Sequence, residues 1–187
     1  MKIVFAFAFI LFVLPLSCLS FSGGVSHYYV ATGTSGPIPK GYGACKKYSI
    51  SPSGTFVIDL ESQQYTAVAS GKVNLTCADG KLRLVSKKPV SLAIKGPATI
   101  ESSASHYFRL NVLDNKGETL IIGSSEGIVW TFSEHLKRGP ISHFFPSFSD
   151  ESIPVMGIKS GSGSISARFL GLTVTIPVSV QVGQAVP

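Results

Sequence analysis

Histidines and serines are the residues of this chain that could perform chemistry. Three histidines each follow a serine and precede two aromatic residues, in segments that begin at Ser26, Ser105 and Ser142. Three imidazoles can ligate a metal ion, and a histidine held between a serine and an acid can activate a nucleophile. The three segments are far apart in the sequence, and their surroundings differ too much for a true repeat.

Other catalytic signals are weak. Asp150 and Glu151 are adjacent in a polar loop, and Gly161-Ser162-Gly163 lies in a predicted turn instead of a strand-to-helix elbow. The sequence therefore predicts a protein that is not an enzyme and that needs no metal or other cofactor. The alternative, an enzyme, requires a cleft that joins a carboxylate to one of the histidines. These are His27, His106, His135 and His143.

Positive charge is concentrated in the first half of the chain. Residues 21–96 hold nine Lys and Arg against three acidic residues, whereas residues 97–187 hold six against seven. Such a surface can bind a polyanion, although lysines more often form only a solvated face. The candidate polyanion-binding residues are Lys46, Lys47, Lys87 and Lys88. We expect a protein or glycan at a cell surface as the partner, and no nucleic acid.

Three phenylalanines mark a second candidate contact surface. Phe144, Phe145 and Phe148 lie in an irregular, proline-containing segment. Loops at the end of a β-sandwich often bind partners, so these aromatics are candidate partner-binding residues. The alternative is that they fold back and close the end of the sandwich.

Two cysteines and one sequon complete the candidate sites. In an oxidising compartment Cys45 and Cys77 are most simply a disulfide, with two buried free thiols as the alternative. Their spacing matches no short zinc or redox motif. Asn74-Leu75-Thr76 is a sequon, and a eukaryotic host could glycosylate Asn74.

The first twenty residues read as a cleaved secretory signal peptide. Lys2 precedes an apolar run at residues 3–14, and small residues follow up to Ser20. The run is shorter than the roughly 20 residues that span a bilayer. A lipoprotein attached through Cys18 is the weaker alternative. We therefore expect a secreted or extracellular-surface protein (periplasmic in a Gram-negative source) with no membrane span after cleavage.

Alternation of apolar and polar side chains indicates strands along most of the mature chain. It is clearest at residues 172–182, where six apolar side chains fall on one face. Asp79-Gly80 predicts a hairpin turn. In that hairpin Leu75 would face Leu84, while Asn74 would point outward.

Lys87-Lys88-Pro89 is the predicted junction of two modules, because proline interrupts sheet pairing. The expected organisation is a signal peptide at 1–20, a smaller basic, hairpin-rich β module at 21–88 and a β-sandwich at 89–187. The fold class is all-β. In the sandwich, Trp130 and the valines near the carboxyl end are expected to meet across the gap between two layers.

Four segments of the second module carry a resemblance to a known family. They are residues 91–97, 107–117, 128–133 and 161–180. Together they resemble bacterial immunoglobulin-like domains of the group 2 type, over about residues 90–182. The segment at 134–154 departs from that pattern.

The resemblance implies an immunoglobulin-like sandwich used as a structural or adhesive module at a cell surface. Partner binding or self-assembly by strand addition, through residues 21–31 or the strand that ends at Val182, would follow from such a role. The alternative function is binding of a polyanion or carbohydrate through the basic first module.

Overall fold

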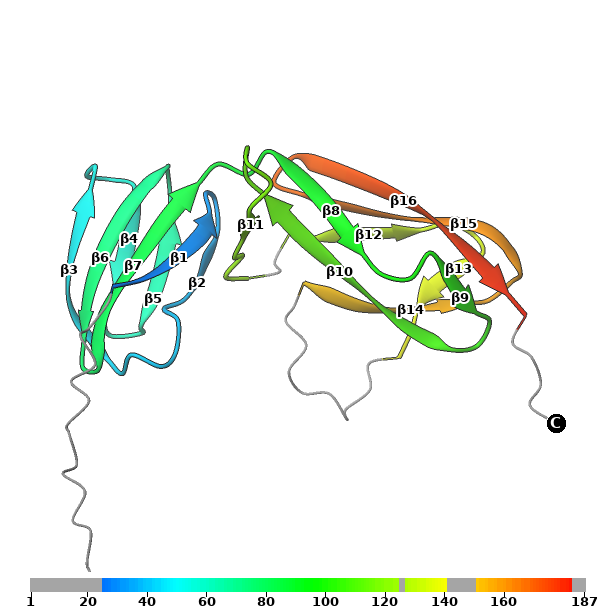
Figure 1. Ribbon diagram of the computed structural model, residues 1–187, viewed down its shortest axis with the longest axis horizontal. Coiled ribbons are helices and arrows are strands. Elements are labelled where there is room, and N and C mark those ends of the chain that lie inside the picture. The colour runs from blue at the N-terminus through cyan, green and yellow to red at the C-terminus, as the bar shows by residue number, and fades with distance from the viewer. Residues whose placement is uncertain (1–24, 125–126, 141–150, 183–187) are drawn as a thin grey trace, which may run out of the picture.

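The computed structural model describes residues 25–124, 127–140 and 151–182. Within these residues the chain forms sixteen strands and no helix, so the prediction of an all-β fold is confirmed. The predicted signal peptide lies outside the described residues, and so do Phe144, Phe145 and Phe148. Figure 1 shows two groups of strands along the long axis of the molecule, with β11 between them.

Seven strands form the first group. They are β1 (Ser26–Ala31), β2 (Ser35–Pro37), β3 (Cys45–Ser51), β4 (Phe56–Asp59), β5 (Gln64–Ala67), β6 (Gly71–Cys77) and β7 (Gly80–Lys87). One sheet has the order β1-β7-β6-β3 and the other the order β2-β5-β4. The strand β1 runs parallel to β7, and the other neighbours are antiparallel.

Nine strands form the second group. They are β8 (Ser91–Lys95), β9 (Thr99–Glu101), β10 (Ser105–Leu113), β11 (Thr119–Leu120), β12 (Val129–Phe132), β13 (Leu136–Arg138), β14 (Ser152–Gly157), β15 (Gly161–Phe169) and β16 (Leu172–Gln181). One sheet contains β8, β10, β14 and β13, with β11 beside the end of β10. The other has the order β9-β16-β15-β12. This is the division of strands found in an immunoglobulin-type sandwich.

The two groups share one topology, which sequence patterning did not predict. The sheet β1-β7-β6-β3 has the same strand order and directions as β9-β16-β15-β12, including a parallel pair formed by the first and last strands. The sheet β2-β5-β4 likewise corresponds to β10-β14-β13. The first half is therefore an immunoglobulin-type sandwich as well, and not only a set of hairpins.

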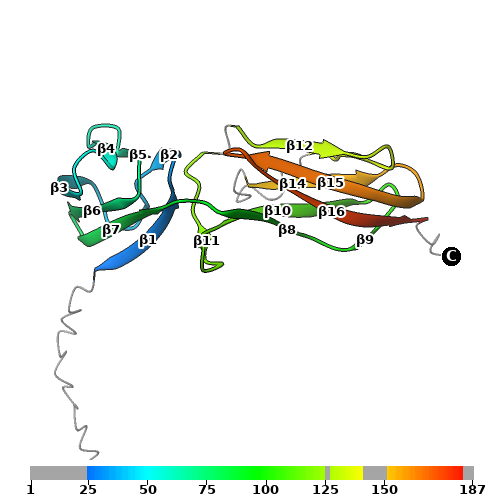
Figure 2. The ribbon, with the colours of Figure 1, turned by 90° about the horizontal axis from the view of Figure 1, so that it is seen from above.

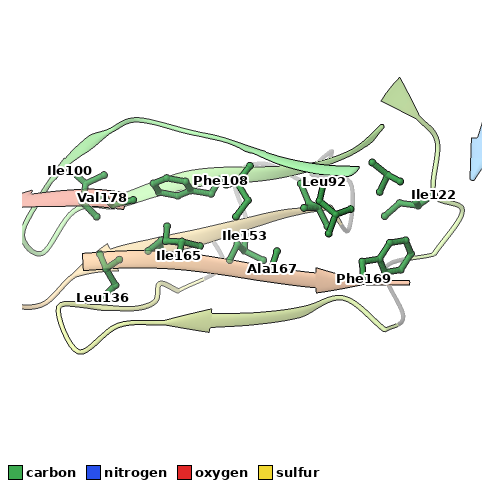
Figure 3. Close-up of a cluster of buried hydrophobic side chains, with 14 of the residues drawn as sticks. Leu92, Ile100, Phe108, Ile122, Leu136, Ile153, Ile165, Ala167, Phe169 and Val178 are labelled. Carbon is green, nitrogen blue, oxygen red and sulfur yellow. The ribbon is translucent and has the colours of Figure 1, made fainter. Parts of the chain in front are cut away.

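Each sandwich has its own apolar core. The first is built around fully buried residues such as Val73, Leu75 and Leu84. The second is larger and includes Phe108 and Ile165, which are both 0% exposed. Figure 3 shows the side chains of this second core between its two layers. Burial of this apolar surface is the main force that holds each pair of sheets together.

A glycine allows the chain to pass from one sheet of the second sandwich to the other. The strand β8 pairs with β10, whereas β9, four residues later, pairs with β16. Gly96 lies in this connection against the ring of buried Phe108, and a Cβ there would be 2.2 Å from a ring carbon. A side chain at this position would therefore displace a core residue.

The predicted hairpin is present, but its register was predicted wrongly. The turn is Ala78-Asp79 instead of Asp79-Gly80, and Leu75 lies opposite Leu82 instead of Leu84. Each side chain still points to the predicted face, because a slip of two residues preserves the face. Asn74 is accordingly on the outer face, opposite Arg83.

Contacts outside the hairpin account for this register. The backbone amides of Ala78 and Asp79 donate to the carbonyl oxygens of Ala44 and Tyr42. The residue that precedes the turn, Cys77, is bonded to the neighbouring strand β3. These long-range contacts override the local preference of Asp-Gly for the two central turn positions.

Trp130 and the carboxyl-terminal valines lie in one sheet, so the prediction that they face each other across the layers was wrong. The strands β12 and β16 both pair with β15, which places Trp130, Ala167 and Val174 in one row. The side chains of Trp130 and Val174 do pack against the core. Alternation identifies the inward face of a strand but not the sheet to which the strand belongs.

Candidate interaction surface

The three histidines that the structure describes lie on separate elements, and His135 Nε2 is 3.7 Å from the exposed carboxylate of its chain neighbour Glu134. His27 lies in β1, His106 in β10 and His135 between β12 and β13, while His143 is outside the described residues. Among the described residues, no three His, Cys, Asp or Glu side chains are grouped so that they could hold a metal ion. His106 Nε2 instead accepts a long hydrogen bond of 3.4 Å from the amide of Glu101.

Strand register gathers five basic side chains on the outer face of the β1-β7-β6-β3 sheet. One row across the strands contains Lys47, Thr76 and Lys81. The next row contains Ser49, Asn74, Arg83 and His27. The third row contains Ser51, Lys72, Val85 and Tyr29. We call these residues the basic face.

The basic face is open to solvent and holds no acidic side chain within its three rows. The side chains of His27, Lys47, Lys72 and Lys81 are exposed, and Arg83 is partly buried. Asp79 lies in the turn beyond the first row. The opposite face of the same sheet supplies buried residues to the first core.

A hollow of about 300 Å³ lies in the basic face between β6 and β7. The polar side chains that line it belong to Asn74, Thr76, Lys81 and Arg83. Arg83 Nε donates to Asn74 Oδ1 at 2.6 Å, which fixes the position of the guanidinium at the wall of the hollow. The site thus combines two cations with an amide and a hydroxyl group.

The four lysines predicted from the sequence have different environments. Lys47 belongs to the basic face, and Lys46 is exposed beside it at an irregularity in the pairing of β3. Lys88 is exposed between β7 and β8. Lys87 instead contacts two carboxylates of the second sandwich, so its charge is already matched within the chain.

Lys87 is the centre of an ionic cluster at the junction of the two sandwiches. Its Nζ donates to Asp114 Oδ2 at 2.7 Å and to a carboxylate oxygen of Glu118, and it lies 4.1 Å from the centroid of the Tyr29 ring. The Asp114 side chain is only 2% exposed. The hydrogen bond from Lys87 lowers the pKa of Asp114 to about 2, and backbone amides of Glu118 and Lys116 act in the same direction. The same pairing raises the pKa of Lys87 above its usual value.

Backbone contacts close the same junction. The amide of Ala31 donates to the carbonyl of Ile121, and the amide of Ile121 donates to the carbonyl of Tyr29. Residues next to β11 therefore extend the β1 edge of the first sandwich. Figure 2 shows β11 from above, between the two groups of strands. A Cβ on Gly36 would lie 2.3 Å from the Cα of Gly123, so the two backbones meet where neither residue has a side chain.

Cys45 and Cys77 form a disulfide between the neighbouring strands β3 and β6. In an antibody domain the corresponding bond joins the two sheets. Here it ties two strands of one sheet together at the end beside the hairpin turn. Asn74 lies in the middle row of the basic face, three residues before Cys77, and its glycosylation stays a prediction.

Sequence reasoning named only one of the five basic residues of the basic face, Lys47, as a polyanion-binding residue. It did not assign His27, Lys72, Lys81 and Arg83 to such a site. The hairpin pattern does indicate that the side chains of Thr76, Lys81 and Arg83 point outward on one face. This was the sequence signal from which part of the basic face could have been found. The pairing of β1 with β7 and of β3 with β6, which brings the rows together, is not encoded in any local pattern.

Neither a protein-family model nor a curated protein matches the chain. Domains 1–6 of the surface-layer protein SbsC align with a TM-score of 0.39 and 16% identity, over 74% of this chain and 20% of that one. This chain thus spans about a fifth of that structure. FdeC, an Escherichia coli adhesin, aligns with a TM-score of 0.43 and 12% identity, over 83% and 61%. The titin domains z1z2, from a complex with telethonin, align with a TM-score of 0.32 and 11% identity, over 87% and 94%.

These similarities are too low to transfer a function to this chain. In the part of the chain that the structure describes, there is no helix with the length and apolar character needed to cross a membrane.

Proposed function

We propose that this chain is a secreted or cell-surface protein that is not an enzyme and that serves as a structural or adhesive module. The observation that carries the proposal is one immunoglobulin-type topology used twice, in two sandwiches with a closely packed junction. Paired sandwiches of this kind present their faces and end loops to partners at a fixed spacing. Membership of the bacterial group 2 type is part of this proposal, and it is supported by the sequence resemblance.

Residues 21–88 and 89–187 are the two domains in this proposal. The two separate cores support this division. The ionic cluster of Lys87 and the backbone bonds of Ile121 would hold the domains in one orientation. These direct ionic and backbone contacts would restrict relative motion more than a linker without contacts.

The test follows the protein in the cells that make it. A tagged full-length chain should be removed from intact cells by added protease, and beads coated with the purified protein should adhere to cell surfaces in competition with soluble protein. A tag found only inside the cells would contradict the location. Adhesion no stronger than that of beads coated with unfolded, reduced protein would contradict the adhesive role.

Self-assembly by strand addition is a version of this proposal. The strands β1 and β16 are paired within their own sandwiches, so a swapped strand would have to leave its sheet. The strands β3 and β12 stand at the ends of their sheets and offer the edges where an added strand would pair. Size-exclusion chromatography over a wide concentration range tests this version. A protein that stays monomeric at every concentration would contradict self-assembly.

A second candidate function is binding of a polyanion or carbohydrate through the basic first domain. It is supported by the five basic side chains of the basic face and the hollow between β6 and β7. Binding to polyanions or glycans that is lost in high salt would support this function. A protein that binds no such ligand at low salt would exclude it.

A further inference from the structure

We propose that the basic face binds an acidic polysaccharide, a linear sugar chain with sulfate or carboxylate groups. The inference rests on the second candidate function and names its ligand class and its contact residues. The basic residues that contact the ligand would be His27, Lys47, Lys72, Lys81 and Arg83. Four of these residues were not candidates for polyanion binding on sequence grounds.

Charge complementarity is the first argument. The three rows of the basic face hold five basic side chains and no acidic one. Successive rows on one face of a strand are about 7 Å apart, because each residue advances the chain by about 3.4 Å. A polyanion that lies along the strands would therefore meet at least one cation in each successive row. Fields from like charges on one face add and attract an extended anion.

Neutral hydrogen-bonding groups between the cations are the second argument. Ser49, Ser51 and Thr76 share rows with the cations and offer hydroxyl groups, while Asn74 offers an amide. Sugar rings carry hydroxyl groups that both donate and accept hydrogen bonds, as these side chains do.

The hollow between β6 and β7 gives the third argument. Its volume is about 300 Å³, it is open at the surface, and Lys81 and Arg83 line it. The hydrogen bond from Arg83 to Asn74 orders the guanidinium before any ligand arrives. A side chain that is already ordered loses less conformational entropy on binding.

The composition of the face argues against nucleic acid and lipid as the ligand. Binding of single-stranded nucleic acid uses several aromatic side chains on which bases stack. Tyr29 is the one aromatic residue in the three rows, and the ammonium group of Lys87 lies over one face of its ring. Membrane attachment would need apolar side chains that enter the bilayer, and Val85 in the third row is only partly exposed. The disulfide also indicates a compartment in which sugar polymers are the common polyanions.

The experiment titrates the full-length chain with heparin at low salt. The test variant is K47Q/K72Q/K81Q, which removes three cations of the basic face. The matched control is K95Q/K116Q/K159Q, which removes three exposed cations of the second sandwich and changes the net charge equally. We expect the test variant to bind heparin about 10- to 100-fold more weakly. The control should change the affinity by less than about 2-fold, and both variants should melt as the unmodified protein does.

Two further ligands test whether the basic face prefers an acidic polysaccharide to other polyanions. A single-stranded oligonucleotide and phosphatidylserine vesicles of matched charge should bind more weakly than heparin. Tighter binding of either one would overturn the choice of ligand class. Equal weakening of heparin binding in both variants would overturn the assignment to this face, because the effect would then reflect only net charge.

The outcome also separates this inference from the function on which it rests. Binding of a neutral glycan that the test variant leaves intact would keep the second candidate function and reject the basic face. Failure to bind heparin, oligonucleotide, vesicles and neutral glycans at low salt would reject both.

Discussion

Tyr65 shows how burial changes a single residue. Its side chain lies in the first core and is 2% exposed, and in the described part of the chain its hydroxyl group has no hydrogen-bond partner. Burial raises the pKa of Tyr65 to about 12. A buried hydroxyl group without a partner costs stability, because it loses its bonds to water.

Tyr65→Phe should therefore stabilise the protein by about 1 kcal/mol at neutral pH. In the unmodified chain the folded-state pKa lies above the unfolded value of about 10, so stability is lost as pH rises from about 10 towards 12. The variant should lack this part of the alkaline loss. Urea unfolding at pH 7 and at pH 11 measures both effects, and a destabilised variant would show that the hydroxyl group has a partner.

Asn74 is the second residue with a testable role, because it lies in the middle row of the basic face. An N-glycan attached there would cover the hollow and compete with an external polysaccharide. Protein from a eukaryotic secretory host should therefore bind heparin more weakly than unglycosylated protein. Protein made in the same host with N-glycosylation inhibited, which leaves Asn74 and its bond to Arg83 in place, should regain affinity, and equal affinity of both forms would contradict this placement.

Among the elements, the pair β3 and β6 depends most on a covalent bond. The disulfide between Cys45 and Cys77 closes a loop with a sequence separation of 32. In the chain-entropy model such a bond stabilises the folded state by about 3–4 kcal/mol. The double variant C45A/C77A should lose about this much free energy of unfolding in urea.

Reduction of the unmodified protein with a thiol reagent is the control for that variant. It should produce a similar loss, while the reagent should leave the double variant unchanged. Equal stability of the oxidised and reduced protein would contradict a stabilising bond.

The alternation of apolar and polar residues predicted which face of a strand each side chain lies on, but it did not predict which strands share a sheet. It assigned the outward positions of Thr76, Lys81 and Arg83, because two-residue periodicity depends only on the local chain. It did not predict that β12 and β16 share a sheet, or that β2, within a Gly- and Pro-rich segment, is a strand at all. Pairings such as β1 with β7 join distant segments, and their register is set by core packing that no short window contains.

At the scale of the whole molecule, the ionic cluster at the junction should make stability depend on acid. The folded-state pKa of Asp114 is about 2, below its unfolded value of about 4. The stability from this carboxylate is therefore present above pH 4 and is lost as pH falls towards 2. Asp114→Asn should melt a few degrees lower at pH 7. It should also lose less stability between pH 4 and pH 2.

The control for that variant is Asp79→Asn, in the exposed hairpin turn of the first sandwich. It should keep the melting temperature and the acid dependence of the unmodified protein. Thermal melts from pH 2 to pH 7 make the comparison. An unchanged acid dependence in Asp114→Asn would show that the cluster does not contribute.

The contact of Gly36 with Gly123 sets how closely the two sandwiches approach. A Cβ on Gly123 would lie 2.4 Å from the Cα of Gly36 and from the carbonyl oxygen of Ser35. Gly123→Ala should therefore separate the junction and weaken the backbone bonds of Ile121. Hydrogen exchange should become faster at the amides of Ala31 and Ile121, while Thr119→Ala, exposed in β11, should leave it unchanged. Unchanged exchange in Gly123→Ala would contradict a tight junction.

The bond between Ile121 and β1 has a consequence for synthesis on the ribosome. The chain emerges from its amino end, so the first seven strands can assemble before residue 121 has been made. During that interval the outer edge of β1 offers unpaired backbone groups to any neighbouring nascent chain. The second half of the polypeptide covers this edge once Ile121 arrives. Slow translation between residues 88 and 121 should therefore increase aggregation of the newly synthesised protein.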